Sequence, residues 1–369
     1  MREPKCPYFG KCGGCETQHI EHELQIRNKL RNVSALLKIP EEKIEVFEGN
    51  EFNYRNRMDF VFNKYGIGLR EKKKWYRIVD VESCAISNEK LNKLLQETRD
   101  FFRNIDYFDI DKRVGTFKYA VIRTAIDTCI TFILNEDSGR KSESIEKIRE
   151  FPRISTADNI IFGYVPAENS DSISNKFEVI KGNELLHENF LGKEFFFHSQ
   201  GFFQNNPAMA GKMIDYVRKK LSSEKGHLLD LYGGVGTFGL CMDSVFEKVT
   251  IVENAGMSVE CARKNIEINN IKNAEAISID AKKIDSVDFL NPLHVIADPP
   301  RTGMDKVALR RLLDLKAETI IYVSCNPSQF AIELPKFIKE DYKVESIALF
   351  DLFPQTNHVE IVVGMRKGH

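Results

Sequence analysis

The sequence of 369 residues lacks a long apolar run, a net charge and an apolar N-terminal segment. A membrane-spanning helix needs about 20 consecutive apolar residues, and no stretch approaches that length, so we expect no association with a membrane. Residues 1–6 contain no apolar core of a secretory signal, which predicts a cytoplasmic protein. Basic residues number 53 and acidic residues 54, so any cationic surface that binds a nucleic acid must be local.

Cysteine is scarce and unevenly placed. Of eight cysteines, Cys6, Cys12 and Cys15 crowd the first fifteen residues, and Cys84 follows after 68 intervening residues. In a reducing compartment, such a cluster indicates metal binding or catalysis more often than disulfides. Four thiolates suit either a tetrahedral zinc ion or a [4Fe–4S] cluster. Zinc ribbons prefer two matched C-x2-C pairs, and this spacing is lopsided.

One segment, residues 51–77, gathers eight basic residues against three acidic ones. It includes Arg55 and Arg57, and the aromatic residues Trp75 and Tyr76 are mixed with the cations. Cations beside aromatic rings are what phosphates and unstacked bases require, so this segment is a candidate RNA-binding surface. The alternative is a solvated hairpin tip with Trp75 in a core.

The apolar pattern predicts two domains, residues 1–192 and 193–369. The first combines helices and strands and is expected to be α+β, with helices at 21–37 and 88–103 and strands at 58–62, 120–126 and 129–134. The second alternates short apolar strands with helices, which predicts a parallel, doubly wound α/β sheet. Its strands are expected at 227–231, 248–252, 276–279, 295–297, 319–323 and 344–349, and its helices at 207–221 and 258–269. A last strand at 358–365 follows closely and is expected to be antiparallel.

A glycine-rich segment follows the first strand of the second domain. Gly234, Gly236 and Gly239 form the pattern G-x-G-x-x-G, and we expect a helix to begin there. Glu253 ends the next strand, 19 residues after Gly234, where a carboxylate can bind the ribose hydroxyls of an adenosine. This pattern alone fits NAD, S-adenosylmethionine or a ligand-free strand–turn–helix.

Two further strand ends carry residues that can take part in catalysis. Asp298 precedes two prolines after strand 295–297, and this stiff shelf suits a methyltransferase that acts on a planar base better than a dehydrogenase. Cys325 follows strand 319–323, at the edge where doubly wound sheets bind ligands, and is a candidate nucleophile. Glu360 enters the last strand, where a carboxylate is out of place unless it faces a polar pocket. The alternatives are a buried structural thiol and a solvent-facing edge residue.

These groups match the requirements of methylation at C5 of uracil. A thiolate that adds to C6 makes C5 nucleophilic, and a base must later remove the C5 proton so that the thiolate leaves. Cys325 and Glu360 fit these roles, while Asp298 and Gln204 can hydrogen-bond the base. The target nucleotide must be reached outside a stack, which favours a flipped or single-stranded base.

Five motifs resemble those of the RNA uracil-C5 methyltransferase family, which makes 5-methyluridine. They are residues 202–206, 230–236, 298–301, 324–327 and 353–360. The resemblance implies a class I (Rossmann-like) S-adenosylmethionine methyltransferase fold in the C-terminal domain, with Cys325 as nucleophile and Glu360 as base. It also implies a cofactor site formed by Gln204, Tyr232, Gly234, Gly236, Thr237, Glu253, Asp280 and Asp298, with Gln204 and Asp298 also facing the uracil.

A subset of this family carries a [4Fe–4S] cluster on a Cys-x5-Cys-Gly-Gly-Cys motif and one distant cysteine. The resemblance therefore implies a cluster held by Cys6, Cys12, Cys15 and Cys84, with zinc as the alternative. Many relatives also have a small RNA-binding barrel, the TRAM domain, ahead of these cysteines. This cluster starts at Cys6, so we expect a branch without that barrel, in which the cysteine-bearing domain and the segment from Arg55 to Arg77 bind the RNA.

The substrate class remains open between two RNAs. Residues 70–80 are most similar to archaeal members that modify the T-loop uridine of tRNA, whereas the missing barrel is typical of a bacterial branch that acts on 23S ribosomal RNA. We favour tRNA and expect a monomer. Two alternatives from other classes are an NAD-dependent dehydrogenase, which leaves Cys325 and Glu360 without a role, and a noncatalytic iron–sulfur RNA-binding protein.

Overall fold

A computed structural model describes residues 1–368 as two compact units. Unit 1 comprises Met1–Glu21, Asn50–His187 and His198–Gln200, and unit 2 comprises His22–Gly49, Glu188–Phe197 and Gly201–His369. The predicted single boundary near Gly192 does not describe this division, because residues 22–49 join the C-terminal unit. No helix in residues 1–368 combines the length and the apolar character that crossing a membrane requires.

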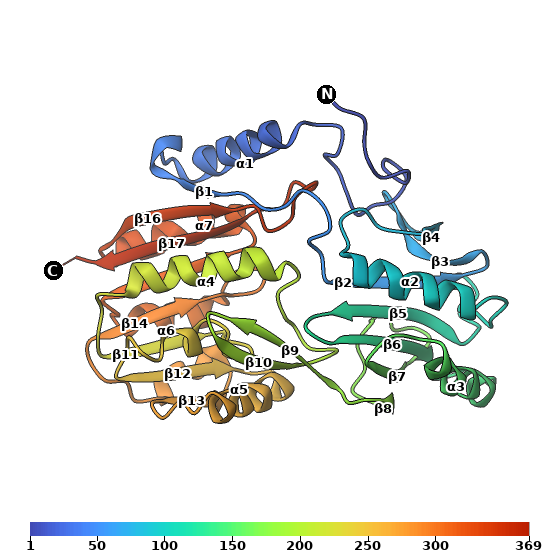
Figure 1. The fold of residues 1–369 in the computed structure, drawn as a ribbon. Coiled ribbons are helices and arrows are strands. Elements are labelled where there is room, and N and C mark those ends of the chain that lie inside the picture. The colour runs from blue at the N-terminus through green and yellow to red at the C-terminus, as the bar shows by residue number, and fades with distance from the viewer. Residues whose placement is uncertain (369) are drawn as a thin grey trace. The chain divides into compact units, whose positions relative to one another are not determined.

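Unit 1 is built on a seven-stranded mixed sheet with the spatial order β4-β3-β2-β5-β6-β7-β8 (Figure 1). Its strands are β2 (Arg57–Asn63), β3 (Gly66–Glu71), β4 (Lys74–Asp80), β5 (Phe117–Thr124), β6 (Thr128–Asn135), β7 (Asn159–Val165) and β8 (Phe177–Lys181). The helices are α2 (Glu89–Phe101) and α3 (Lys141–Glu150), and α3 connects the parallel strands β6 and β7. The helix predicted at 88–103 and the strands predicted at 58–62, 120–126 and 129–134 are confirmed, whereas the helix predicted at 21–37 belongs to unit 2.

Local chemistry explains the elements near the basic segment. The strands β2 and β3 form a hairpin in which Asn63 pairs with Gly66, so the turn is Lys64–Tyr65. Gly66 adopts a φ of 144°, which a residue without a side chain tolerates. Trp75 on β4 is 61% exposed, so it does not belong to a core.

Unit 2 contains an eight-stranded sheet with the order β1-β16-β17-β15-β14-β11-β12-β13. Its strands are β1 (Glu45–Phe47), β11 (His227–Leu231), β12 (Lys248–Glu253), β13 (Ala274–Ser278), β14 (Leu293–Ala297), β15 (Thr319–Ser324), β16 (Tyr342–Phe350) and β17 (Glu360–Lys367). All neighbours are parallel except β17, which is antiparallel to both β15 and β16, as predicted. The strands β9 (Leu185–Phe190) and β10 (Lys193–His198) form a separate ribbon.

Five helices belong to unit 2: α1 (His22–Leu37), α4 (Pro207–Leu221), α5 (Gly256–Ile268), α6 (Lys306–Asp314) and α7 (Pro327–Lys339). Residues of α1, α6 and α7 share one apolar core with the central strands. Figure 1 shows α4 in front of the sheet and α6 and α7 behind it. The sheet is therefore covered on both faces, which explains why β11, β14 and β15 are buried along their whole length.

One predicted element is wrong. After the glycine-rich loop the chain forms a single turn of 3-10 helix, Gly239–Met242, rather than an α-helix. The amide N–H of Gly239 donates to the carboxylate of Asp230 at 2.8 Å, which holds the chain close to β11. Few residues remain before β12 begins at Lys248, so there is no room for a longer helix.

Candidate active site

Three strand ends bring the predicted reactive residues to one edge of the unit 2 sheet. Asp298 follows β14 and Cys325 follows the parallel strand β15. Glu360 begins β17, and because β17 is antiparallel to β15, its start lies where β15 ends. Ser324 pairs with Ile361, so the next residues along, Cys325 and Glu360, are neighbours across the strands.

Burial and mutual repulsion dominate the electrostatics of this group. Burial, followed by the carboxylates of Glu360 and Asp298, raises the pKa of Cys325 to about 12, while Arg301 acts in the opposite direction. Glu360 is 5% exposed, and burial together with Asp298 raises the pKa of its carboxyl group well above the usual range. The pKa of Asp298 is also raised, by burial and by the charge of Asp230. At neutral pH, Cys325 and Glu360 therefore favour their protonated forms.

The turn that presents Cys325 is set by its neighbours. Asn326 caps α7, since its side-chain oxygen accepts a hydrogen bond from the amide N–H of Gln329, and Pro327 occupies the first helical position. The chain thus passes from strand to helix within a few residues. The side-chain amide of Asn326 also donates to the carbonyl oxygen of Arg301 at 2.9 Å, which ties this turn to the loop that follows Asp298.

A buried carboxylate holds the shelf formed by Asp298 and the prolines. Glu333 on α7 is 1% exposed and accepts hydrogen bonds from the amide N–H of Met304 at 3.0 Å and from the hydroxyl of Tyr322 at 2.6 Å. Gly303 has a φ of 77°, and a Cβ there would lie 2.0 Å from a Glu333 oxygen. The loop therefore has little freedom to move relative to the sheet.

The loop that carries Gln204 is anchored at its end. Asn206 caps α4 by accepting from the amide N–H of Met209, and its amide donates to the carbonyl oxygen of Leu352 at 3.0 Å. This contact joins the loop to the segment that leads into Glu360. The half-buried side chain of Gln204 makes no hydrogen bond within residues 1–368, so its amide is available to a ligand.

The glycine-rich loop and the predicted cofactor residues form a second group. The amide N–H of Gly234 donates to Glu253 at 3.2 Å. Tyr232 has a φ of 63°, and after burial the nearby carboxylate of Asp280 raises the pKa of its hydroxyl, with a smaller contribution from Glu253. These residues therefore lie close together. Thr237 is half-buried one position after Gly236, which has a φ of 85°.

Helix α1 contributes contacts that sequence analysis missed. Lys29 is 5% exposed, and its ammonium group donates to Asp351 at 2.6 Å and to the carbonyl oxygen of Phe353 at 3.2 Å. Gln25 and Gln355 form two hydrogen bonds, of 3.0 and 3.2 Å. These contacts hold the segment that precedes Glu360. A signal was present, because Gln25 and Lys29 occupy the buried side of an amphipathic helix.

The four clustered cysteines meet in unit 1. Cys6, Cys12, Cys15 and Cys84 all line one cavity, together with apolar residues such as Met58. Burial, together with a smaller contribution from the neighbouring sulfurs, raises the pKa of Cys12 to about 11 and that of Cys15 to about 12. The side chain of Asn92 fixes Cys84 by accepting from its amide N–H at 2.8 Å and donating to its carbonyl oxygen at 3.0 Å.

The predicted RNA contacts Arg55 and Arg57 lie at the start of β2 in unit 1. Arg57 forms an ion pair with Asp59 at 2.9 Å, and the guanidinium of Arg55 donates to the carbonyl oxygen of Arg57 at 2.8 Å. Their role toward RNA stays a prediction. Elsewhere in residues 1–368, Glu224, His294 and Glu318 have metal-like spacing, but Arg366 already forms an ion pair with Glu224.

The chain is similar in sequence and fold to known RNA methyltransferases. A family model described as tRNA (uracil-5-)-methyltransferase matches residues 21–367. The tRNA (uracil(54)-C(5))-methyltransferase of Pyrococcus furiosus is 32% identical over 98% of this chain and 85% of its own length. An uncharacterized RNA methyltransferase of Caldanaerobacter subterraneus is 33% identical over 99% of this chain and 85% of its own length. The crystal structure of Pyrococcus abyssi tRNA (uracil-54, C5)-methyltransferase in complex with S-adenosyl-L-homocysteine has a TM-score of 0.80 and 28% identity, and the match covers 95% of this chain and 85% of that one.

Proposed function

Because the chain belongs to the tRNA (uracil-5-)-methyltransferase family, we propose that it transfers a methyl group from S-adenosylmethionine to C5 of uracil 54 in tRNA. The observation that carries this proposal is the pairing of Cys325 with Glu360 across β15 and β17, beside Asp298. A nucleophile and a base at adjacent positions are what substitution at C5 requires. Family membership also removes the dehydrogenase alternative.

The reaction requires the ionised forms of Cys325 and Glu360, so both groups must first lose their protons to solvent. The Cys325 thiolate then forms a bond to C6 of the uracil, and the electron pair of the C5–C6 double bond moves toward the O4 carbonyl, which makes C5 nucleophilic. Bound S-adenosylmethionine supplies the methyl group that C5 accepts. The Glu360 carboxylate then removes the remaining proton from C5, the sulfur–C6 bond breaks, and the ring regains its double bond. Asp298 and the free amide of Gln204 hold the base edge during these steps.

We propose that the cofactor binds to the second group of residues, at the same edge of the sheet. Glu253 ends β12, and Asp280 follows β13. Tyr232 and the glycines follow β11. We propose that the Glu253 carboxylate accepts from the ribose hydroxyls, and that Tyr232 and Thr237 line the rest of the site. No helix dipole contributes here, because the turn at Gly239–Met242 is too short.

Two substitutions test the assignment of the nucleophile and the base. Cys325→Ala is expected to abolish methyl transfer and covalent trapping of RNA. Glu360→Gln is expected to accumulate a covalent RNA–protein adduct, because methylation precedes proton loss. Denaturing gels with labelled tRNA, followed by mass spectrometry of the adduct, measure both effects. Cys261→Ser, at a buried thiol of α5 that has no proposed role, is the control. Normal turnover of Glu360→Gln would exclude Glu360 as the base.

The substrate is tested with wild-type protein and labelled S-adenosylmethionine. Total tRNA and ribosomal RNA from cells lacking 5-methyluridine are offered separately, and the product nucleoside is identified by mass spectrometry. Label as 5-methyluridine in tRNA at position 54 supports the proposal. Label found only in ribosomal RNA would identify 23S ribosomal RNA as the substrate instead of tRNA. The absence of label from both pools would contradict catalysis on RNA.

We further propose that the four cysteines hold a [4Fe–4S] cluster. Burial raises the pKa of Cys12 and Cys15, so a bound cation must compensate the charge of their thiolates. All four cysteines line one cavity, as a shared metal group requires. We favour the cluster over zinc because the spacing of Cys6, Cys12 and Cys15 lacks the two matched C-x2-C pairs that zinc ribbons prefer.

A further inference from the structure

A cavity in unit 1 lies apart from the cysteines and from the proposed catalytic and cofactor-binding residues, and its lining includes Arg70, Tyr76 and Arg77 of the basic segment 51–77. It has a volume of about 700 Å³ and is lined by the hairpins of β2, β3 and β4, by β5 and by residues 107–111. Volumes of 300–1,000 Å³ are typical of sites for small ligands, so the cavity can hold one nucleotide.

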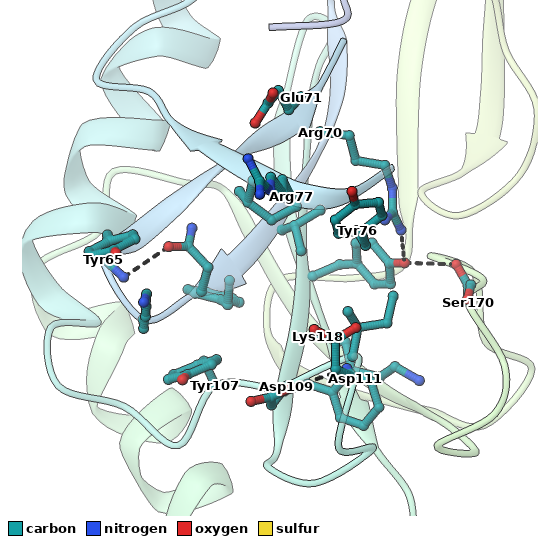
Figure 2. Close-up of a pocket in the computed structure, with 18 residues that line it drawn as sticks. Tyr65, Arg70, Glu71, Tyr76, Arg77, Tyr107, Asp109, Asp111, Lys118 and Ser170 are labelled. Atoms are coloured by element: carbon teal, nitrogen blue, oxygen red, sulfur yellow. Dashed lines mark hydrogen bonds between the residues drawn. The ribbon is translucent and has the colours of Figure 1, made fainter. Parts of the chain in front are cut away.

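The rim of this cavity is aromatic and exposed. Tyr65 is 71% exposed and Tyr76 is 46% exposed, and Tyr107 is half-buried. Figure 2 shows Tyr65 and Tyr107 on one side of the cavity and Tyr76 on the other. Since large exposed rings are costly to leave in water, rings that converge on a cavity indicate a partner with a flat apolar face. A nucleobase has such a face.

Cations stand beside these rings. The ammonium of Lys64 lies 4.6 Å from the centroid of Tyr65, and the guanidinium of Arg77 lies 6.0 Å from that of Tyr76. Within residues 1–368, neither cation forms an ion pair. Arg70 is fixed deeper in the cavity, since it donates to the hydroxyl of Tyr119 at 2.9 Å (Figure 2).

The acidic residues of the lining are largely engaged. Glu71 forms an ion pair with Lys74 at 2.7 Å. Asp109 accepts from the amide N–H groups of Asp111 and Lys112, both at 3.1 Å. The positive charges of Lys64 and Arg77 therefore remain at the rim, beside exposed aromatic rings. This arrangement suits a phosphate next to a stacked base.

We propose that this cavity binds an unpaired nucleotide of the RNA substrate, outside the catalytic site. The base stacks among Tyr65, Tyr76 and Tyr107, and its phosphate lies against Arg77 and Lys64. This inference rests on the proposed function, because that function makes RNA the ligand. The occupant is a nucleotide within a strand rather than a free metabolite, because the ring of the exposed Trp75 lies 6.1 Å from that of the lining residue Tyr76 and can contact a neighbouring nucleotide.

The test compares alanine variants, which lose the aromatic ring, with phenylalanine variants, which keep it, all in the full-length protein. A tRNA transcript is the probe, and its Kd is measured by fluorescence anisotropy. Tyr65→Ala and Tyr76→Ala are each expected to weaken binding about 5- to 100-fold, whereas Tyr65→Phe and Tyr76→Phe keep it. Arg77→Ala is expected to lower the salt dependence of log Kd by about 0.7–0.9, and Arg153→Ala, an exposed arginine of the same unit, leaves it unchanged.

The outcomes separate this inference from the proposed function. In the alanine variants, the Kd for S-adenosylmethionine and kcat at saturating tRNA are expected to stay at wild-type values. If wild-type protein methylates tRNA and the alanine variants bind it equally well, the cavity does not bind RNA while the proposed function stands. If the variants lose binding to a tRNA that the wild-type protein never methylates, the cavity is supported and the proposed function fails. Loss in Tyr65→Phe as large as in Tyr65→Ala would exclude stacking.

Discussion

Among single residues, Cys325 shows the largest conflict between its surroundings and its proposed chemistry. The thiolate is the reactive form, yet burial and two carboxylates raise the pKa of this thiol to about 12. Arg301 acts in the opposite direction. It is the last residue of the motif 298–301, and a role for it emerges only from the structure.

This conflict predicts a pH dependence. Because the pKa of Cys325 lies near 12, the thiolate fraction rises about tenfold per pH unit across the range from 7 to 10. The alkylation rate of the Cys325 peptide, followed by mass spectrometry, is therefore expected to rise without a plateau over this range. Arg301→Ala is expected to slow alkylation at each pH, since it removes the charge that lowers the pKa. A plateau below pH 9 would show that the free thiol ionises more easily than its surroundings indicate.

At the scale of elements, α1 contacts the segment that precedes Glu360, although the two are far apart in the sequence. Lys29 and His22 both contact Asp351, which is completely buried, at 2.6 and 2.9 Å. Burial lowers the pKa of Lys29, and Asp351 raises it in compensation. The ion pair therefore helps to position the segment that ends at Glu360, and Lys29 is a positioning residue.

Removing the ammonium group tests this role. Lys29→Met leaves Asp351 buried with one partner fewer, so we expect the free energy of unfolding to fall by about 3–5 kcal/mol. Urea denaturation measures this change. Arg27→Ala breaks an exposed ion pair on the same helix and is expected to cost less than about 1 kcal/mol. An equal effect of both substitutions would contradict the positioning role of Lys29.

At the scale of the whole molecule, the residues proposed for RNA and those proposed for catalysis lie in different units. In unit 1, the cysteine-bearing loop pairs with the basic hairpin. The amide N–H of Gly13 donates to the carbonyl oxygen of Arg70 at 3.0 Å, and that of Lys72 donates to the carbonyl oxygen of Lys11 at 2.7 Å. A metal group bound to the cysteines would thus hold one edge of the surface that we propose to bind RNA.

Removal of the metal is therefore expected to weaken tRNA binding without changing the binding of S-adenosylmethionine. Cys84→Ser, or treatment with an iron chelator, is expected to abolish the visible absorption and iron content and to weaken tRNA binding. The Kd for S-adenosylmethionine, measured by calorimetry, is expected to stay unchanged, because its proposed ligands lie in unit 2. Cys129→Ser, at a buried thiol of unit 1 outside the cluster, is the control. Iron retained in Cys84→Ser would remove this residue from the ligand set.

Much of the fold could be predicted because its signals are local. Apolar runs predicted the strands of unit 2, and the Asn-Pro pairs at Asn206 and Asn326 mark the helix starts behind two site loops. The helix expected after Gly239 was wrong, since a glycine pattern does not report the hydrogen bond to Asp230 that holds the chain. The membership of α1 in unit 2 could not be predicted, because its contacts are with residues more than 300 positions away.

The sequence alone determined which chemical groups are present and which strand or turn carries each of them. A thiol after β15, a carboxylate at the start of β17 and four clustered cysteines follow from residue type and spacing. Only the tertiary structure decided which of these groups meet. Cys325 and Glu360 are neighbours because β17 inserts antiparallel between β15 and β16. Such pairings depend on contacts between segments that are remote in the sequence, and a local pattern does not encode them. The same holds for the burial that shifts the pKa values of these groups.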